Sequence, residues 1–134
     1  MKFFLDNNWS PHLAAALAVL NRPYGHQVEH LKDRFAPATP DHQWISKLGG
    51  EGGWIVITKD RLRKGPLEQA ALRSSGLLVY IFAKQWSHAN DWDQAAGLIR
   101  WWPLILSVSG PVGAGAFEVP YKLSGKGQFR QVKI

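Results

Sequence analysis

The sequence predicts an α/β fold in which a mostly parallel central sheet lies between two layers of helices. Short apolar segments rich in β-branched residues alternate with segments whose apolar residues recur at helical spacing. The strand-like segments 54–58 and 77–82 are apolar throughout, as expected of strands buried on both faces. Strands that alternate with helices favour parallel pairing through helical crossovers, which gives three layers, α/β/α.

The composition limits the architecture and the class of partner. A chain of 134 residues with 46% hydrophobic and 19% charged residues is globular, and we expect one domain spanning residues 1–134. No cysteine is present, which excludes disulfides, thiolate catalysis and cysteine-bound zinc. The formal charge of +6 favours an anionic partner, because an excess of Lys and Arg attracts phosphodiesters.

The sequence indicates a soluble, cytoplasmic protein that makes no membrane contact. The apolar run before Asp6 is far shorter than the apolar core of a signal peptide, which has about 7 residues or more. No later segment approaches the roughly 20 apolar residues of a membrane-spanning helix.

The chain opens with a strand and a helix. Residues 2–5 form an apolar run that ends at Asp6, where two asparagines favour a turn, so we expect a buried strand. A serine and a proline at 10–11 suit the N-cap and first position of a helix, and the apolar residues after them recur at i, i+3, i+4 and i+7. This helix is expected to end within residues 21–25.

A second strand and helix follow. Residues 26–31 form a weaker strand candidate, and the loop after it contains Asp33. A threonine and a proline at 39–40 open the next helix, in which Asp41 lies in the first turn on the face that carries the apolar residues. Glycines at 49–50 are expected to end this helix.

The middle of the chain repeats the alternation. The β-branched run 54–58 predicts the clearest strand, which is followed by Asp60 and a basic loop at 61–64. Residues 66–73 are expected to be helical, and residues 77–82 to form another buried strand.

The last third gives weaker signals. Residues 90–102 predict a helix that ends at Pro103, because proline breaks a helix interior. Residues 110–115 are interpreted as a glycine-rich loop. Residues 116–123 and 128–132 can then pair as a C-terminal β-hairpin around the Ser-Gly-Lys-Gly turn between them.

Three aspartates are expected to meet at one edge of the sheet. Asp6 and Asp60 follow strands and Asp41 starts a helix, and these ends share the ligand-binding edge of a parallel sheet. Clustered carboxylates repel and raise one another's pKa unless a cation lies between them. Their hard oxygen donors favour Mg²⁺ or Mn²⁺. We therefore predict a divalent metal site.

The predicted site suits phosphodiester chemistry. A metal held by carboxylates can orient water, lower its pKa and neutralise charge that develops on a phosphate. Arg61, Arg63 and Lys64 directly follow Asp60 and are expected to bind the substrate phosphate.

Each aspartate also has a purely structural interpretation. Asp60 and Asp6 are ordinary turn residues in that interpretation, and Asp41 is an acid that meets the helix dipole. Asp91 and Asp93 are interpreted mainly as helix-start acids, with a fourth metal ligand as the alternative. The histidines lack the spacing of a zinc site.

The seven tryptophans are many for this length. Trp44 and Trp54 occupy positions expected in the core. The positions of Trp9, Trp86 and the pair 101–102 are less determined, and base stacking and a protein interface are both left open for them.

The segments FFLDNNWSP, HLKDRFAPATPDHQWI and WIVITKDR together resemble a compact PIN-like nuclease family, of the type found among VapC-like toxins of toxin–antitoxin modules. The resemblance covers most of the chain, and the tail segment GAFEVPYKL is similar to that of this group. It implies a three-layer α/β/α PIN-like fold and a Mg²⁺- or Mn²⁺-dependent ribonuclease that uses a metal-activated water. It also implies a cognate antitoxin as inhibitor and a homodimer.

The resemblance assigns roles by motif. Asp6 corresponds to the first-strand acid, Asp41 to the helix-start acid, and Thr58 with Asp60 to the strand-end threonine–aspartate pair. Asn7 and Thr58 are expected to support these acids.

Larger PIN domains carry another acid between the first two of these motifs, and this chain is too short there to contain it. Asp33 is the candidate additional acid, with Glu29 as the alternative. The number of metal ions, one or two, is left open.

Two other functions suit a related fold. In a receiver-type phosphoacceptor, paired acids accompany the first strand, whereas here Asn7 and Asn8 follow Asp6, and Lys84 lies just past a strand. A PIN-like module that binds RNA or protein without cutting is the second. The three clustered aspartates argue against a module that only binds, because clustered negative charge does not help to bind a phosphate.

Overall fold

The computed structural model describes residues 1–123 and 129–133. Strands and helices alternate along the described chain, with short 3₁₀ helices at three connections. The elements in chain order are β1 (Lys2–Leu5), α1 (Pro11–Asn21), η1 (Arg22–Tyr24), β2 (Gln27–His30), η2 (Leu31–Asp33), α2 (Asp41–Glu51), β3 (Trp54–Thr58), α3 (Pro66–Ser75), β4 (Leu78–Phe82), η3 (Lys84–His88), α4 (Asp91–Val112), β5 (Gly115–Val119) and β6 (Arg130–Val132).

The described strands form one sheet in the order β2-β1-β3-β4-β5-β6. The first five run parallel, and β6 pairs antiparallel with β5. The predicted mostly parallel sheet is therefore confirmed, and so is an antiparallel pair at the C-terminal end. The turn that was expected between these last two strands falls within residues 124–128, outside the described residues.

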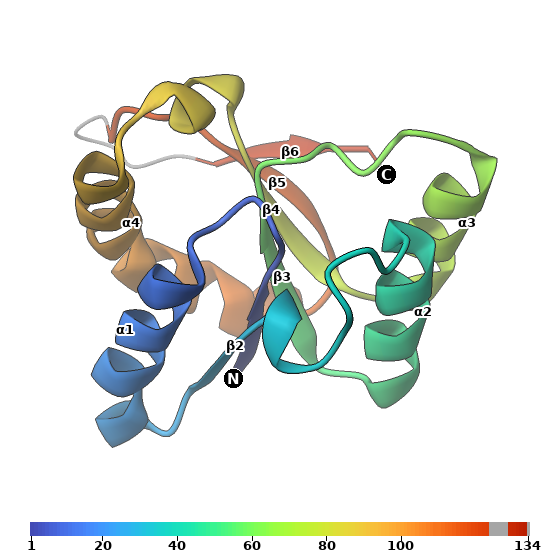
Figure 1. Cartoon of the computed structure of the whole chain (residues 1–134), viewed down its shortest axis with the longest axis horizontal. Coiled ribbons are helices and arrows are strands. Elements are labelled where there is room, and N and C mark those ends of the chain that lie inside the picture. The colour runs from blue at the N-terminus through green and yellow to red at the C-terminus, as the bar shows by residue number, and fades with distance from the viewer. Residues whose placement is uncertain (124–128, 134) are drawn as a thin grey trace.

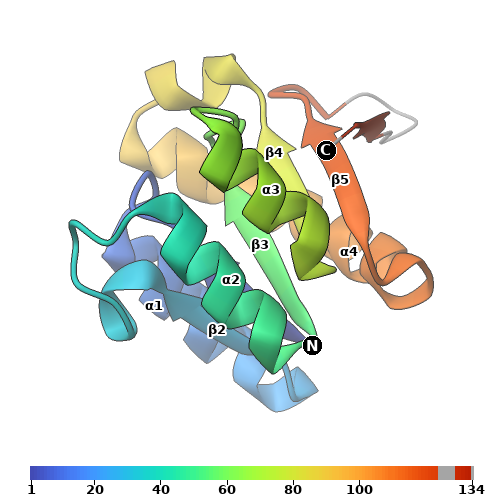
Figure 2. The same ribbon diagram turned by 90° about the vertical axis from the view of Figure 1, so that its right-hand side faces the viewer.

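Helices cover both faces of the sheet, as predicted. Figure 1 shows the sheet on edge, with α1 and α4 on one side and α2 and α3 on the other, and Figure 2 shows the second pair in front of the strands. Successive strand residues pack into two separate cores. Phe3, for example, lies in the core on the α1–α4 side and Phe4 in the core on the α2–α3 side. Six of the seven tryptophans are buried in these cores, and the seventh, Trp92, is 85% exposed. Trp44 and Trp54 lie on the α2–α3 side, as predicted, and the α1–α4 side holds Trp9, Trp86, Trp101 and Trp102.

The helix expected to stop at Pro103 continues to Val112, which corrects that prediction and the glycine-rich loop expected at 110–115. Pro103, which removes one backbone hydrogen bond, lies on the exposed side of the helix together with Ile99. The opposite face buries Trp101 and Ile105, and this packing holds the helix together across the proline. No helix in the described part of the chain is long and apolar enough to cross a membrane.

The fold places three loops and a helix start along one edge. The segments after β1, β3 and β4 lie together at the upper end of the sheet in Figure 1, beside the start of α2. Helix α1 begins there because the Ser10 hydroxyl accepts hydrogen bonds from the N–H groups of His12 and Leu13, at 3.1 and 3.4 Å, and Pro11 needs no partner.

Candidate functional site

The three predicted aspartates lie along the carboxyl edge of the sheet. Asp6 follows β1, Asp41 is the first residue of α2, and Asp60 lies just beyond β3. The Thr58 hydroxyl joins two of them, because it donates to Asp6 Oδ2 and accepts a hydrogen bond from the Asp60 N–H at 2.9 Å. The Lys64 ammonium joins the other pair, 3.0 Å from Asp60 Oδ2 and 3.9 Å from Asp41 Oδ2.

Asp6 is the most deeply buried of these aspartates, with 5% of its surface exposed. Burial, with smaller contributions from the Asp41 and Asp60 carboxylates, raises the pKa of Asp6 to about 6. Hydrogen bonds from Thr58 and from the Asn8 N–H, the latter 3.2 Å long, oppose the rise. Asp6 therefore changes its protonation state close to neutral pH.

Asp60 shapes the loop that follows β3. Its Oδ1 accepts a hydrogen bond of 2.9 Å from the Leu62 N–H. Leu62 has a φ of 57°, a left-handed conformation that few residues other than glycine adopt, and its side chain is 1% exposed. With the backbone turned in this way, Arg61 and Arg63 lie toward α3 and β4, and Lys64 returns to the acids.

A fourth acid, Glu68, joins the site and was not singled out from the sequence. It lies in the first turn of α3, is 6% exposed, and accepts a hydrogen bond of 2.5 Å from the Lys64 N–H. Burial raises the pKa of Glu68 to about 7, and a hydrogen bond with the Asp41 carboxylate also raises it. Helix α3 starts at the same edge as Asp41, so the argument applied to Asp41 identifies Glu68 as well.

The comparison with known families decides the family of this fold. A family model described as a PIN like domain matches residues 1–84, well over half of the chain. The chain belongs to the PIN-like domain family. The match contains all four acids of the carboxyl edge, and the PIN-like fold is a nuclease-type fold. The searches of curated proteins and of solved structures found no match.

PIN-like domains typically use divalent metals, and the donor set of this PIN-like chain suits such an ion. Asp6, Asp41, Asp60 and Glu68 offer hard carboxylate oxygens, and burial raises the pKa values of Asp6 and Glu68, with the neighbouring carboxylates adding to the rise. The side chains nevertheless do not surround a common point. Among residues 1–123 and 129–133, no three acidic or histidine side chains are close enough to hold an ion jointly, and the Lys64 ammonium contacts Asp41 and Asp60 instead.

A second cation borders the acids from the α4 side. The half-buried Lys59 ammonium donates to Gln94 Oε1 at 3.0 Å and lies 4.6 Å from the centre of the Trp9 ring. It takes part in none of the ion pairs found within the described residues. Burial lowers the pKa of Lys59, while Asp6 and Asp91 oppose that shift. Its place directly before Asp60 was the available sequence signal.

The three predicted phosphate-binding residues separate in the PIN-like structure. Lys64 faces the acids, whereas Arg61 pairs with Glu118 at 2.6 Å and Arg63 donates to the Lys133 carbonyl at 2.6 Å. The basic loop therefore directs Lys64 to the acids and the two arginines to the pocket on the α3 side, and the backbone turn at Leu62 separates them.

The two remaining predicted residues have local partners. Asn7 Nδ2 donates to the Pro37 carbonyl at 2.9 Å, which fixes the loop before α2 against the loop after β1. Asp33 Oδ2 accepts a hydrogen bond of 2.8 Å from the His30 N–H and so completes a capping box at η2. The acid that contacts Asp41 is Glu68, contributed by α3.

Proposed function

We propose that this chain is a metal-dependent endoribonuclease that hydrolyses RNA phosphodiesters, with Asp6, Asp41 and Asp60 as its catalytic and metal-binding residues. The observation that carries the proposal is the meeting of these acids, from three separate segments, at the ligand-binding edge of a nuclease-type fold. Acids that only cap turns or helices need not gather at one edge, and they need not include a carboxyl as deeply buried as that of Asp6.

The chain's own groups have distinct parts in this proposal. Mg²⁺ or Mn²⁺ held by the three aspartates would polarise the phosphate and make a bound water more acidic. Thr58 fixes the orientation of the Asp6 carboxyl through its hydroxyl. Lys64, whose side chain is 72% exposed, is free to move from the carboxylates to a substrate phosphate, and Lys59 places a second ammonium on the other side.

We further propose that the protein is the toxin component of a toxin–antitoxin module, inhibited by a cognate antitoxin and acting on cytoplasmic RNA. The layer formed by α1, η1 and α4 supports a protein partner, because it exposes several large apolar side chains. They are Val19, Leu20, Tyr24, Trp92 and Ile99. The same surface is available for a homodimer.

The central experiment incubates the purified protein with single-stranded and structured RNA, with Mn²⁺ or with EDTA. We expect cleavage only with the metal, and loss of cleavage in Asp60→Asn, which keeps an oxygen for the Leu62 N–H. Asp93→Asn, at an exposed acid in the first turn of α4, is the matched control and should retain activity. Equal cleavage by the wild type and Asp60→Asn would place the activity outside this site.

The position of Lys64 favours one second candidate, a PIN-like module that binds RNA without cutting it. In this alternative the ammonium neutralises Asp41 and Asp60 permanently and no metal is needed. RNA binding without cleavage, together with unchanged stability in Mn²⁺, would support this function over the nuclease.

A further inference from the structure

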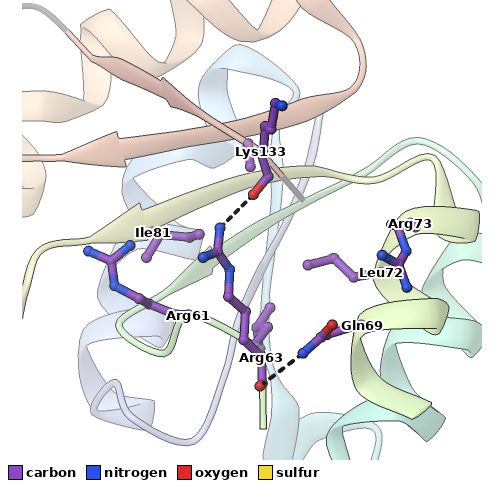
Figure 3. A pocket seen from close by; sticks show the side chains of 9 residues that line it. Arg61, Arg63, Gln69, Leu72, Arg73, Ile81 and Lys133 are labelled. Atoms are coloured by element: carbon purple, nitrogen blue, oxygen red, sulfur yellow. Dashed lines mark hydrogen bonds between the residues drawn. The ribbon is translucent and has the colours of Figure 1, made fainter. Parts of the chain in front are cut away.

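A second concave site lies on the α3 side of the loop that follows Asp60. Figure 3 shows this pocket between the loop, α3, β4 and the C-terminal segment. Its volume is about 340 Å³, within the range of small-ligand sites. Its lining combines basic and apolar side chains. The basic ones are Arg61, Arg63, Arg73 and Lys133, and the main apolar ones are Leu72 and Ile81.

The pocket has an excess of positive charge. Four of its described lining residues are basic and none is acidic. The nearby Glu118 carboxylate accepts from Arg61 at 2.6 Å, but it is shared with Arg130 at 3.1 Å. Arg73 takes part in none of the ion pairs formed among the described residues. A guanidinium with no carboxylate partner, placed at the rim of a cavity, suits an anionic ligand.

The shape of the lining suits a nucleotide better than a bare anion. Leu72 and Ile81, each 4% exposed, give the pocket apolar lining, and in Figure 3 the Arg63 side chain runs between them toward the Lys133 carbonyl. Guanidinium groups bind phosphate through paired N–H donors and also stack on bases. The amide of Gln69, which donates to the Arg63 carbonyl at 3.3 Å, adds a polar group to the lining.

The pocket and the acids are separated by a single turn of backbone. Leu62 lines the pocket, and its N–H is bound to the Asp60 carboxylate at 2.9 Å. A polynucleotide with one phosphate at the acids therefore continues within reach of Arg61 and Arg63. A base can enter the pocket only when it is unpaired and turned out of a stack, which a single strand permits and a duplex does not.

We propose that this pocket binds one nucleotide of single-stranded RNA next to the scissile bond, with Arg63 and Arg73 on its phosphate and Leu72 and Ile81 against its base. The choice of RNA as the ligand rests on the proposed function. The pocket itself contributes binding and not chemistry, because its described lining holds no acid or other general base.

The test is a binding measurement that does not depend on cleavage. A fluorescently labelled single-stranded 10-nucleotide RNA is titrated with the full chain in EDTA at several KCl concentrations. We expect Arg63→Ala/Arg73→Ala to weaken binding by about tenfold at 100 mM KCl. It should also reduce the slope of log K against log [KCl] by about 0.7, since both arginines contact the same phosphate and each neutralised phosphate on a single strand contributes about 0.7. Arg73→Ala alone, at an exposed position of α3, should give about half of this slope change.

The matched control is Arg22→Ala/Arg100→Ala, which removes two exposed arginines from η1 and α4 in the other helical layer. An equal loss in this control, or no loss in either pocket variant, would overturn the proposal. The proposal would also be overturned if the pocket variants lost the same affinity for duplex RNA as for single-stranded RNA. Binding of adenosine monophosphate in the pocket without any change in RNA affinity would overturn it as well. RNA binding that needs the pocket, in a protein that never cleaves RNA, would support the pocket and refute the nuclease. Cleavage that needs Asp60 but not the pocket would do the reverse.

Discussion

The Asp6 carboxyl is deeply buried, and burial disfavours its negatively charged form. Its titration therefore changes the stability of the protein with pH. Thr58 and Asn8 donate hydrogen bonds to the carboxylate but replace only part of the lost hydration, so the pKa rises from 3.8 to about 6. Between these two values the folded protein holds a proton that the unfolded chain has released. The stability contributed by protonated Asp6 is therefore present below about pH 4 and is lost as the pH rises through 6.

This linkage predicts the behaviour of Asp6→Asn, which cannot ionise. Relative to the wild type, its free energy of unfolding should rise between pH 4 and pH 7, by up to about 3 kcal/mol for a shift of about two pKa units. Urea denaturation in EDTA at four pH values measures the difference. Asp93→Asn, at an exposed acid, controls for the loss of one charge. A difference between Asp6→Asn and wild type that stays constant across the range would contradict the burial of a titrating carboxyl.

Lys64 is expected to compete with a metal ion for Asp41 and Asp60. Because its side chain is 72% exposed, each ion pair is worth at most about 1 kcal/mol. Lys64→Gln should therefore bind Mn²⁺ up to about fivefold more tightly, by calorimetric titration, and yet cleave RNA more slowly because a phosphate contact is lost. Lys47→Gln, at an exposed position of α2, is the control for net charge. Unchanged Mn²⁺ affinity in Lys64→Gln would show that the ammonium and the ion do not compete.

At the scale of elements, the packing of α2 on α3 sets the position of Asp41 relative to Glu68. A Cβ added at Gly49 would lie 2.9 Å from the Ser75 Cα, whereas one added at Gly50 would meet nothing within 4 Å. Gly50→Ala should stabilise the protein by about 0.5–1 kcal/mol through helix propensity. Gly49→Ala should destabilise it by roughly 1–3 kcal/mol, since the helices must separate. Urea denaturation compares the two variants, and equal stabilisation by both would disprove the close approach.

Local signals predicted most elements well. The β-branched run at 54–58 became β3 with the same bounds, and the Ser-Pro pair at 10–11 became the N-cap and first residue of α1. Helix α4 was cut short in the prediction because the rule for proline considers only the backbone. In the structure the buried face through Trp101 and Ile105 compensates for one unpaired carbonyl.

The candidate site was predictable only in outline. The shared edge of the sheet follows from topology, so Asp6, Asp41 and Asp60 were correctly placed on one side. The direction of each side chain in the loop after β3 depends on the left-handed backbone at Leu62, which no sequence pattern announces. For that reason the sequence grouped Arg61 and Arg63 with Lys64 as phosphate-binding residues, whereas in the structure the two arginines line a separate pocket.

At the scale of the whole molecule, the two helical layers present different surfaces. The α1–α4 layer exposes large apolar side chains such as Leu20 and Trp92, whereas the α2–α3 side carries the basic pocket lined by Arg63 and Arg73. The acids lie at the edge between the layers (Figure 1). A protein partner on the first surface and RNA on the second would therefore not compete for the same side chains.

The last prediction concerns the stability of the whole fold. A metal that binds only the folded state adds RT ln(1 + [M]/Kd), about 2.7 kcal/mol at one hundred times Kd. Binding must also release protons from Asp6 and Glu68, whose pKa values are about 6 and 7, so the gain should be larger at pH 7.5 than at pH 5. Urea denaturation with Mn²⁺ or EDTA at both pH values measures it, and Asp60→Asn should lose most of the gain. If Mn²⁺ stabilises wild type and Asp60→Asn equally, the ion binds elsewhere and the four acids serve the fold alone.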